Sequence, residues 1–147
     1  MAKSKGFTLI ELVLVMGLIT IVTTGVLVSM RDNSYRTLYN ASLTLQSDLR
    51  YAQRRAITEG RRHGILFEPT QNRYHIILTN PTENIRTVNL PSGVIFQDIV
   101  GGSVVTFLPR GTSSGGFTIT LANSNYRQNL TVGVSGGRVR VWDIVPN

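Results

Sequence analysis

The sequence predicts an α+β fold in which a long N-terminal helix packs on an antiparallel, β-rich C-terminal domain. Three observations lead to this prediction. An apolar run over residues 7–30 continues into residues 31–59, where apolar residues recur every three or four positions. No proline interrupts the chain before Pro69. After Gly60, short β-prone runs follow one another, separated by Pro, Gly, Asn and Ser rather than by helical segments.

Length and composition restrict the class of protein. The chain has 147 residues, which suits one modest domain. With 41% hydrophobic and 16% charged residues, it is too apolar to be disordered. Cysteine is absent, which excludes a disulfide scaffold, a thiolate metal site and a cysteine nucleophile. The net charge of +7 fits nucleic acid or an anionic membrane as a partner without choosing between them.

The first thirty residues have the composition of a membrane anchor. Residues 1–6 are polar and contain both lysines of the chain, and residues 7–30 then run with Glu11 as their one charged residue. About 20 apolar residues suffice for a helix to span a bilayer. We therefore expect residues 7–30 to form a transmembrane helix. The preceding lysines predict a cytoplasmic N-terminus and a C-terminal domain on the opposite side of the membrane.

Residues 31–60 are expected to form the amphipathic half of the same helix. One apolar stripe runs along it at spacings of three and four: Leu38, Ala41, Leu45, Leu49, Ala52 and Ala56. Arg50, Arg54 and Arg55 lie off this stripe. Gly60 is expected to end the helix, because glycine readily adopts the left-handed conformation found just past helix C-termini.

Residues 61–147 are expected to form the β-rich globular domain. Their short strand-like runs are Gly64–Glu68, Tyr74–Thr79, Arg86–Leu90, Gly93–Gln97, Val104–Leu108, Phe117–Leu121, Leu130–Val134 and Arg138–Val141. Because no helices separate these runs, the sheet is expected to be antiparallel.

The N-terminal segment Lys5-Gly6-Phe7-Thr8-Leu9-Ile10-Glu11-Leu12 carries the most specific motif of the chain. It resembles the class III signal of type IV pilins and type II secretion pseudopilins, with its basic leader, Gly, Phe, T-L-I-E run and long apolar helix. The resemblance implies that prepilin peptidase cleaves after Gly6 and methylates the new N-terminus at Phe7. It also implies anchoring in the bacterial inner membrane and assembly with other pilin or pseudopilin subunits through the N-terminal helix.

Glu11 is an ionisable residue within an otherwise apolar run. A charge at such a depth is costly unless it is paired, so Glu11 is a candidate functional residue. The resemblance implies an assembly salt bridge to the methylated amine of a neighbouring subunit's Phe7. The alternative is a carboxylate tolerated near the membrane edge. Many major pilins carry a proline within this helix, whereas here Gly17 and Gly25 are the only breakers, which leaves open whether the helix melts on assembly.

The rest of the chain is similar to the GspH/FimT branch of minor pseudopilins and minor pilins. The matching pieces are Leu49–Ile57, His63–Phe67, Phe107–Thr112 and Gly137–Arg140. This resemblance implies two alternative functions. FimT proteins of the type IV pilus are implicated in DNA uptake, whereas GspH is a minor subunit of the secretion pseudopilus.

The segment Gly137-Arg138-Val139-Arg140 is a candidate DNA-binding strand. On a strand, Arg138, Arg140 and Trp142 point to one face, while the valines point to the other. Two guanidiniums about 7 Å apart suit successive phosphates, and the indole can stack on a base. The segment resembles the GRxR motif with which FimT proteins bind DNA. The alternative is an ordinary solvated strand face.

No sequence pattern indicates an enzyme. The chain has no P-loop, G-x-G-x-x-G or EF-hand pattern, and its Asp and Ser residues form no recognisable triad. His63 and His75 are expected to be strand residues without chemistry, and neither a metal nor a cofactor is expected. The sequence therefore predicts a DNA-binding minor pilin or, alternatively, a structural minor pseudopilin of a type II secretion system with no DNA binding.

Overall fold

The structure, a computed structural model, describes residues 9–147, and for residues 22–32 it describes the backbone alone. The helix α1 runs from Leu9 to Glu59. It is followed by Gly60, whose φ of 63° is the left-handed conformation typical of a glycine just past a helix end. The predicted end of the helix is therefore confirmed. The chain divides into two compact units between Asn33 and Ser34.

The first unit contains the N-terminal part of α1. The side chains of residues 9–21 are exposed, and Glu11 lies in the first helical turn. Gly6 and Phe7, the predicted cleavage and methylation residues, lie outside the described residues. The expected membrane segment, residues 7–30, also begins outside them, and its side chains from residue 22 onward are not described. Within the described part of the chain, no helix is long and apolar enough to cross a membrane.

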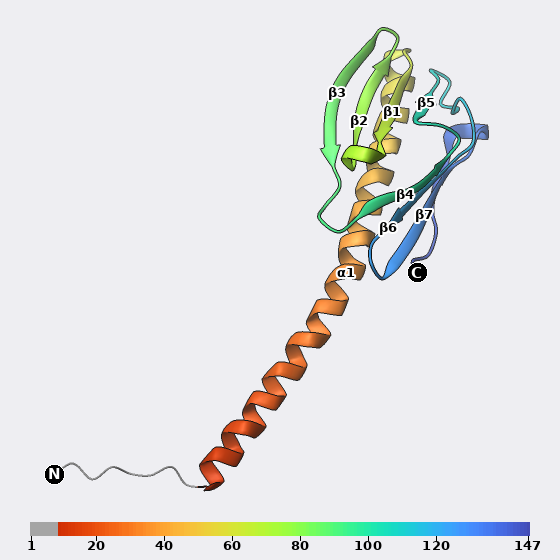
Figure 1. Cartoon of the computed structure of the whole chain (residues 1–147). Helices are drawn as coiled ribbons and strands as arrows, with labels where there is room; N and C mark the ends of the chain where they lie inside the picture. Colours follow the sequence, from red (N-terminus) through yellow and green to blue (C-terminus); the bar gives the residue numbers. More distant parts are fainter. Residues whose placement is uncertain (1–8) are drawn as a thin grey trace, which may run out of the picture. The chain divides into compact units, whose positions relative to one another are not determined.

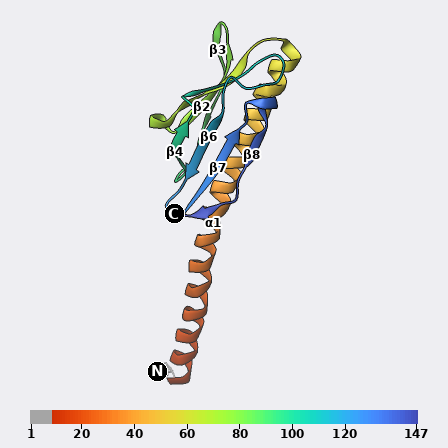
Figure 2. The same cartoon turned by 90° about the vertical axis from the view of Figure 1, so that its right-hand side faces the viewer.

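The second unit, residues 34–147, contains two antiparallel sheets that lie along the C-terminal half of α1 (Figure 1). The first sheet has the strand order β3-β2-β1-β5 and the second has the order β4-β6-β7-β8, with β9 also paired to β7. The strands are β1 (His63–Glu68), β2 (Arg73–Thr79), β3 (Thr82–Asn89), β4 (Ile95–Val100), β5 (Val104–Phe107), β6 (Phe117–Ala122), β7 (Tyr126–Val132), β8 (Val139–Val141) and β9 (Val145–Pro146). Two short 3-10 helices, η1 (Pro69–Gln71) and η2 (Ser135–Gly137), lie between strands. Figure 2 shows β7 and β8 alongside α1.

This arrangement confirms the predicted α+β fold class. Three strands differ from the prediction by three or four residues at one end, and the other predicted strands differ by one residue. β3 begins at Thr82, four residues earlier than predicted, because its polar start pairs with β2 across a bulge. β4 continues to Val100 because a bulge after Phe96 keeps it paired with β6. β7 begins at Tyr126 because polar residues there pair with β6. The short strand β9 was not predicted.

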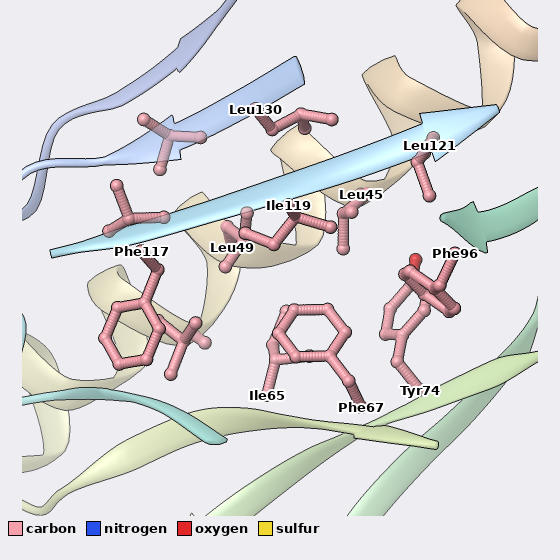
Figure 3. Close-up of a cluster of buried hydrophobic side chains, with 14 of the residues drawn as sticks. Leu45, Leu49, Ile65, Phe67, Tyr74, Phe96, Phe117, Ile119, Leu121 and Leu130 are labelled. Atoms are coloured by element: carbon pink, nitrogen blue, oxygen red, sulfur yellow. The ribbon is translucent and has the colours of Figure 1, made fainter. Parts of the chain in front are cut away.

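The core lies between α1 and the inner faces of both sheets (Figure 3). All six residues of the predicted apolar stripe on the helix are buried, which confirms its amphipathic character. Phe67 of β1 packs edge to face against Phe96 of β4, with ring centroids 5.5 Å apart. Figure 3 shows Leu49 of α1 beside Ile119 of β6. The helix and the two sheets therefore share one hydrophobic core.

Candidate functional site

The strand β8 lies at the edge of the second sheet and presents alternate residues to solvent. Val139 is buried and Val141 is half-buried, whereas Arg138, Arg140 and Trp142 are exposed. The antiparallel pairing of β8 with β7 produces this alternation. The structure therefore places the two arginines and the tryptophan of the candidate DNA-binding strand on one solvent-facing side.

Trp142 holds the side chain of Arg140. The guanidinium of Arg140 lies over the indole ring, 5.4 Å from the ring centroid, in a cation–π contact. The indole Nε1–H donates a hydrogen bond to Oγ1 of Thr131 on β7 at 3.2 Å. The stacking partner of Trp142 in the structure is thus a guanidinium, where the sequence suggested a base. This contact fixes the position of a positive charge on the exposed face.

An open groove of about 800 Å³ lies between α1 and residues 138–141, which we call the β8 segment. Arg50 and Arg54 line it from the helix, and Arg138 and Arg140 line it from the strand; we call these four residues the groove arginines. The other lining residues are Gln46, Gln53, Thr131, Gly133, Gly136, Val139 and Val141. Among these described lining residues there is no Asp or Glu. The four side chains therefore give the groove a single sign of charge.

Hydrogen bonds hold the turn before the β8 segment against the helix. The Nε2 amide of Gln53 on α1 donates hydrogen bonds to the carbonyl oxygens of Gly111, at 2.7 Å, and of Gly136, at 2.9 Å. Gly137 is buried beside them, with a φ of 57°. A Cβ atom at Gly137 would lie 2.5 Å from the Gly111 oxygen and 2.6 Å from Nε2 of Gln53. Glycine is therefore required at position 137, immediately before Arg138.

Two carboxylates of the helix, Asp48 and Glu59, are engaged away from the groove. Asp48 accepts a hydrogen bond from the Tyr74 hydroxyl at 2.7 Å and forms an ion pair with Arg86. Glu59 accepts a hydrogen bond from Nε of Arg55 at 2.5 Å, which lowers the pKa of its carboxyl. Within residues 9–147, the groove arginines form no ion pair. Their charges are therefore available to a ligand.

Three further arginines and the two histidines lie elsewhere. Arg61, Arg62 and Arg110 are exposed but do not line the groove. His63 and His75 are buried in β1 and β2, where they lie beside glutamates. Among the described residues, no group of His, Asp and Glu is suited to hold a metal ion. Of the site residues predicted from the sequence, Arg138 and Arg140 line the groove.

Arg50 and Arg54 were not assigned to a site from the sequence. They are four residues apart, so they share one helix face, and they lie off the buried stripe. That spacing was the available signal. The position of β8 beside this flank of the helix depends on tertiary packing, which helical periodicity does not reveal.

Comparison with known proteins gives matches along most of the chain. The model of the family described as type II transport protein GspH matches residues 41–137, and that of the prokaryotic N-terminal methylation motif matches residues 1–27. No curated protein sequence matches the chain.

Two kinds of solved structure share the fold. The type IV minor pilin FimU of Pseudomonas aeruginosa is similar with a TM-score of 0.63 and 16% identity, over 74% of this chain and 90% of that one. The minor pseudopilin EpsH from the type 2 secretion system of Vibrio cholerae is similar with a TM-score of 0.62 and 14% identity, over 71% of this chain and 95% of that one. At such low identities, these likenesses establish a common fold.

Proposed function

The chain belongs to the GspH family of minor pilins and pseudopilins, and on this premise we propose that it is a type IV pilus subunit that binds DNA through Arg138 and Arg140. Members of this family are structural subunits and not enzymes. The N-terminal methylation motif implies processing by prepilin peptidase, anchoring in the inner membrane and assembly with other pilin subunits.

The proposal assigns roles to three N-terminal residues. The peptidase cleaves after Gly6 and methylates Phe7. In the fibre, Glu11 pairs with the methylated amine of a neighbouring subunit's Phe7. Before assembly, the N-terminus faces the cytoplasm and the globular domain faces the periplasm. The match to the methylation motif over residues 1–27 supports the roles at the N-terminus. The two lysines before the apolar run support the orientation.

The observation that carries the DNA proposal is that Arg138 and Arg140 line an open groove that has no acidic lining residue. Guanidinium groups bind phosphate through paired N–H donors, and their charge persists at any physiological pH. Cations held close together without carboxylate partners repel one another, and a polyanion relieves that repulsion. The cation–π contact with Trp142 also keeps Arg140 in place before a ligand arrives.

A structural minor pseudopilin of a type II secretion system, with no DNA binding, is the second candidate function. It is favoured by the matching family, whose description is a type II transport protein, and by the likeness to EpsH. In that function, Arg138 and Arg140 belong to an ordinary solvated face. The two candidates therefore differ in whether these arginines bind nucleic acid.

DNA binding by the full-length chain in a neutral detergent tests this difference. We expect the wild type to raise the fluorescence anisotropy of a labelled duplex at low salt. The double variant Arg138→Gln/Arg140→Gln is expected to bind about tenfold more weakly or worse, because two phosphate contacts are lost.

The matched control is Arg61→Gln/Arg62→Gln, which removes the same charge from exposed positions outside the groove. We expect this control to retain most of the affinity. If the wild type does not bind DNA, or if the two double variants bind equally well, the DNA proposal is wrong. The secretion function then stands.

A further inference from the structure

We infer that Arg50 and Arg54 of α1 form the second wall of a site for one sugar–phosphate backbone, which lies along the groove opposite Arg138 and Arg140. The inference rests on the proposed function. It adds to that function two helix residues and the chemical class of the ligand, a nucleic acid bound through its phosphates and not through its base edges.

The spacing of the arginines on the two walls is similar. Arg50 and Arg54 are four residues apart on α1, which corresponds to about 6 Å along the helix axis. Arg138 and Arg140 are two residues apart in an extended segment, which corresponds to about 7 Å. Two rows of charge with nearly equal spacing can contact the same run of phosphates from both sides.

The helix arginines are also available to a ligand, which the neighbouring Arg55 is not. Arg55 donates to Glu59 at 2.5 Å and lies 5.7 Å from the centroid of the Tyr51 ring. The side chains of Arg50 and Arg54 are exposed and form no ion pair within the described residues. The unpaired positive charge of this part of the helix therefore faces the groove.

The polar groups of the groove favour phosphate over base recognition. Arginine side chains donate hydrogen bonds but accept none, so they pair with phosphate oxygens and, among the base edges of the major groove, fully match only the two acceptors of guanine. The amide nitrogen Nε2 of Gln53 already donates to the carbonyl oxygens of Gly111 and Gly136. The indole of Trp142 stacks on Arg140. The site is therefore expected to bind a phosphate backbone regardless of base sequence.

The double variant Arg50→Gln/Arg54→Gln, in the full-length chain, tests the helix wall. Both side chains are exposed, so the fold is expected to tolerate the change. We expect affinity for labelled DNA to fall about tenfold or more. For duplex DNA, the slope of log K against log salt is expected to fall in magnitude by about 2, because each phosphate contact contributes about 0.9. The variant Arg50→Lys/Arg54→Lys is expected to recover part of the affinity, since it keeps the charge.

Affinities for a duplex and for a single strand of the same length, each in two unrelated sequences, show which form of nucleic acid the groove binds. Weaker binding of either form by Arg50→Gln/Arg54→Gln supports the inference and shows which form the groove accepts. A large difference in affinity between the two sequences would overturn recognition through phosphates alone.

Two results separate this inference from the proposed function. If Arg50→Gln/Arg54→Gln binds as well as Arg61→Gln/Arg62→Gln, while Arg138→Gln/Arg140→Gln has lost binding, the helix wall is refuted and the proposed function stands. If the wild type binds neither the duplex nor the single strand, the proposed function itself fails.

Discussion

Gly137 determines how closely the β8 segment approaches the helix. It has a positive φ and is buried, and an added Cβ would collide with the Gly111 carbonyl oxygen and the Gln53 amide. The preceding Gly136 also has a positive φ, of 80°, but a Cβ there would meet nothing within 4 Å. An alanine at position 136 would therefore add backbone strain alone, whereas an alanine at position 137 would add both backbone strain and a steric collision.

We expect Gly137→Ala to weaken DNA binding although every arginine remains, because the collision displaces Arg138 and Arg140 from the groove. Gly136→Ala is expected to cost about 1–2 kcal/mol of stability through its left-handed backbone and to keep the affinity. Anisotropy with labelled duplex, together with thermal unfolding of both variants, measures these effects. Equal DNA affinity in the two folded variants would show that binding does not depend on the close approach of the β8 segment to the helix.

At the scale of elements, a buried polar contact joins α1 to the first sheet. Asp48 of the helix accepts a hydrogen bond from Tyr74 of β2 and pairs with Arg86 of β3. Burial, assisted by the hydrogen bond to Asp48, raises the pKa of the Tyr74 phenol above its ordinary value. The phenol therefore stays protonated, and able to donate to Asp48, up to alkaline pH.

Replacing Asp48 with Ala is expected to lower the free energy of unfolding by about 2–4 kcal/mol, because the buried Tyr74 hydroxyl loses its acceptor. DNA affinity is expected to be unchanged, since Asp48 does not line the groove. Thermal unfolding followed by circular dichroism measures the change. Arg86→Ala is the comparison, with a smaller expected cost, because Arg86 is 54% exposed and Asp48 keeps the hydrogen bond from Tyr74. Wild-type stability in Asp48→Ala would contradict a structural role for this contact.

The elements differ in how far the sequence revealed them. The helix stripe and most strands were predictable because burial repeats with the period of each element. The start of β3 and the first residues of β7 were not, because pairing with a neighbouring strand holds these polar segments in place. The same limit applies to the site. The arginines of the β8 segment follow a recognisable pattern, whereas the opposing arginines of α1 join them only through packing.

At the scale of the whole molecule, processing changes the balance of charge. Of the 15 Lys and Arg residues, the two lysines, Lys3 and Lys5, lie in the predicted leader, so the other 13 are all arginines. The proposed cleavage after Gly6 would therefore leave a chain whose Lys and Arg residues are all arginines. Such a chain suits contacts with phosphate better than one that carries the same charge on lysine.

Co-expression with prepilin peptidase is expected to give a chain that begins at N-methyl-Phe7, and intact-mass measurement of the purified protein checks this. The variant Glu11→Ala is expected to be processed normally but to be missing from sheared fibres, because the pairing partner of the methylated amine is lost. An unprocessed chain in the presence of active peptidase would contradict the assignment of Gly6. Normal incorporation of Glu11→Ala would contradict the assembly salt bridge.

The salt dependence of duplex binding tests the central claim most directly. If the four groove arginines neutralise phosphates, log K for the full-length chain falls with log salt with a slope of about −3.6. The variant with all four replaced by Gln is expected to show weak binding with a slope close to zero. A wild-type chain without salt-dependent binding, or a fourfold variant with the wild-type slope, would contradict the groove as a DNA site.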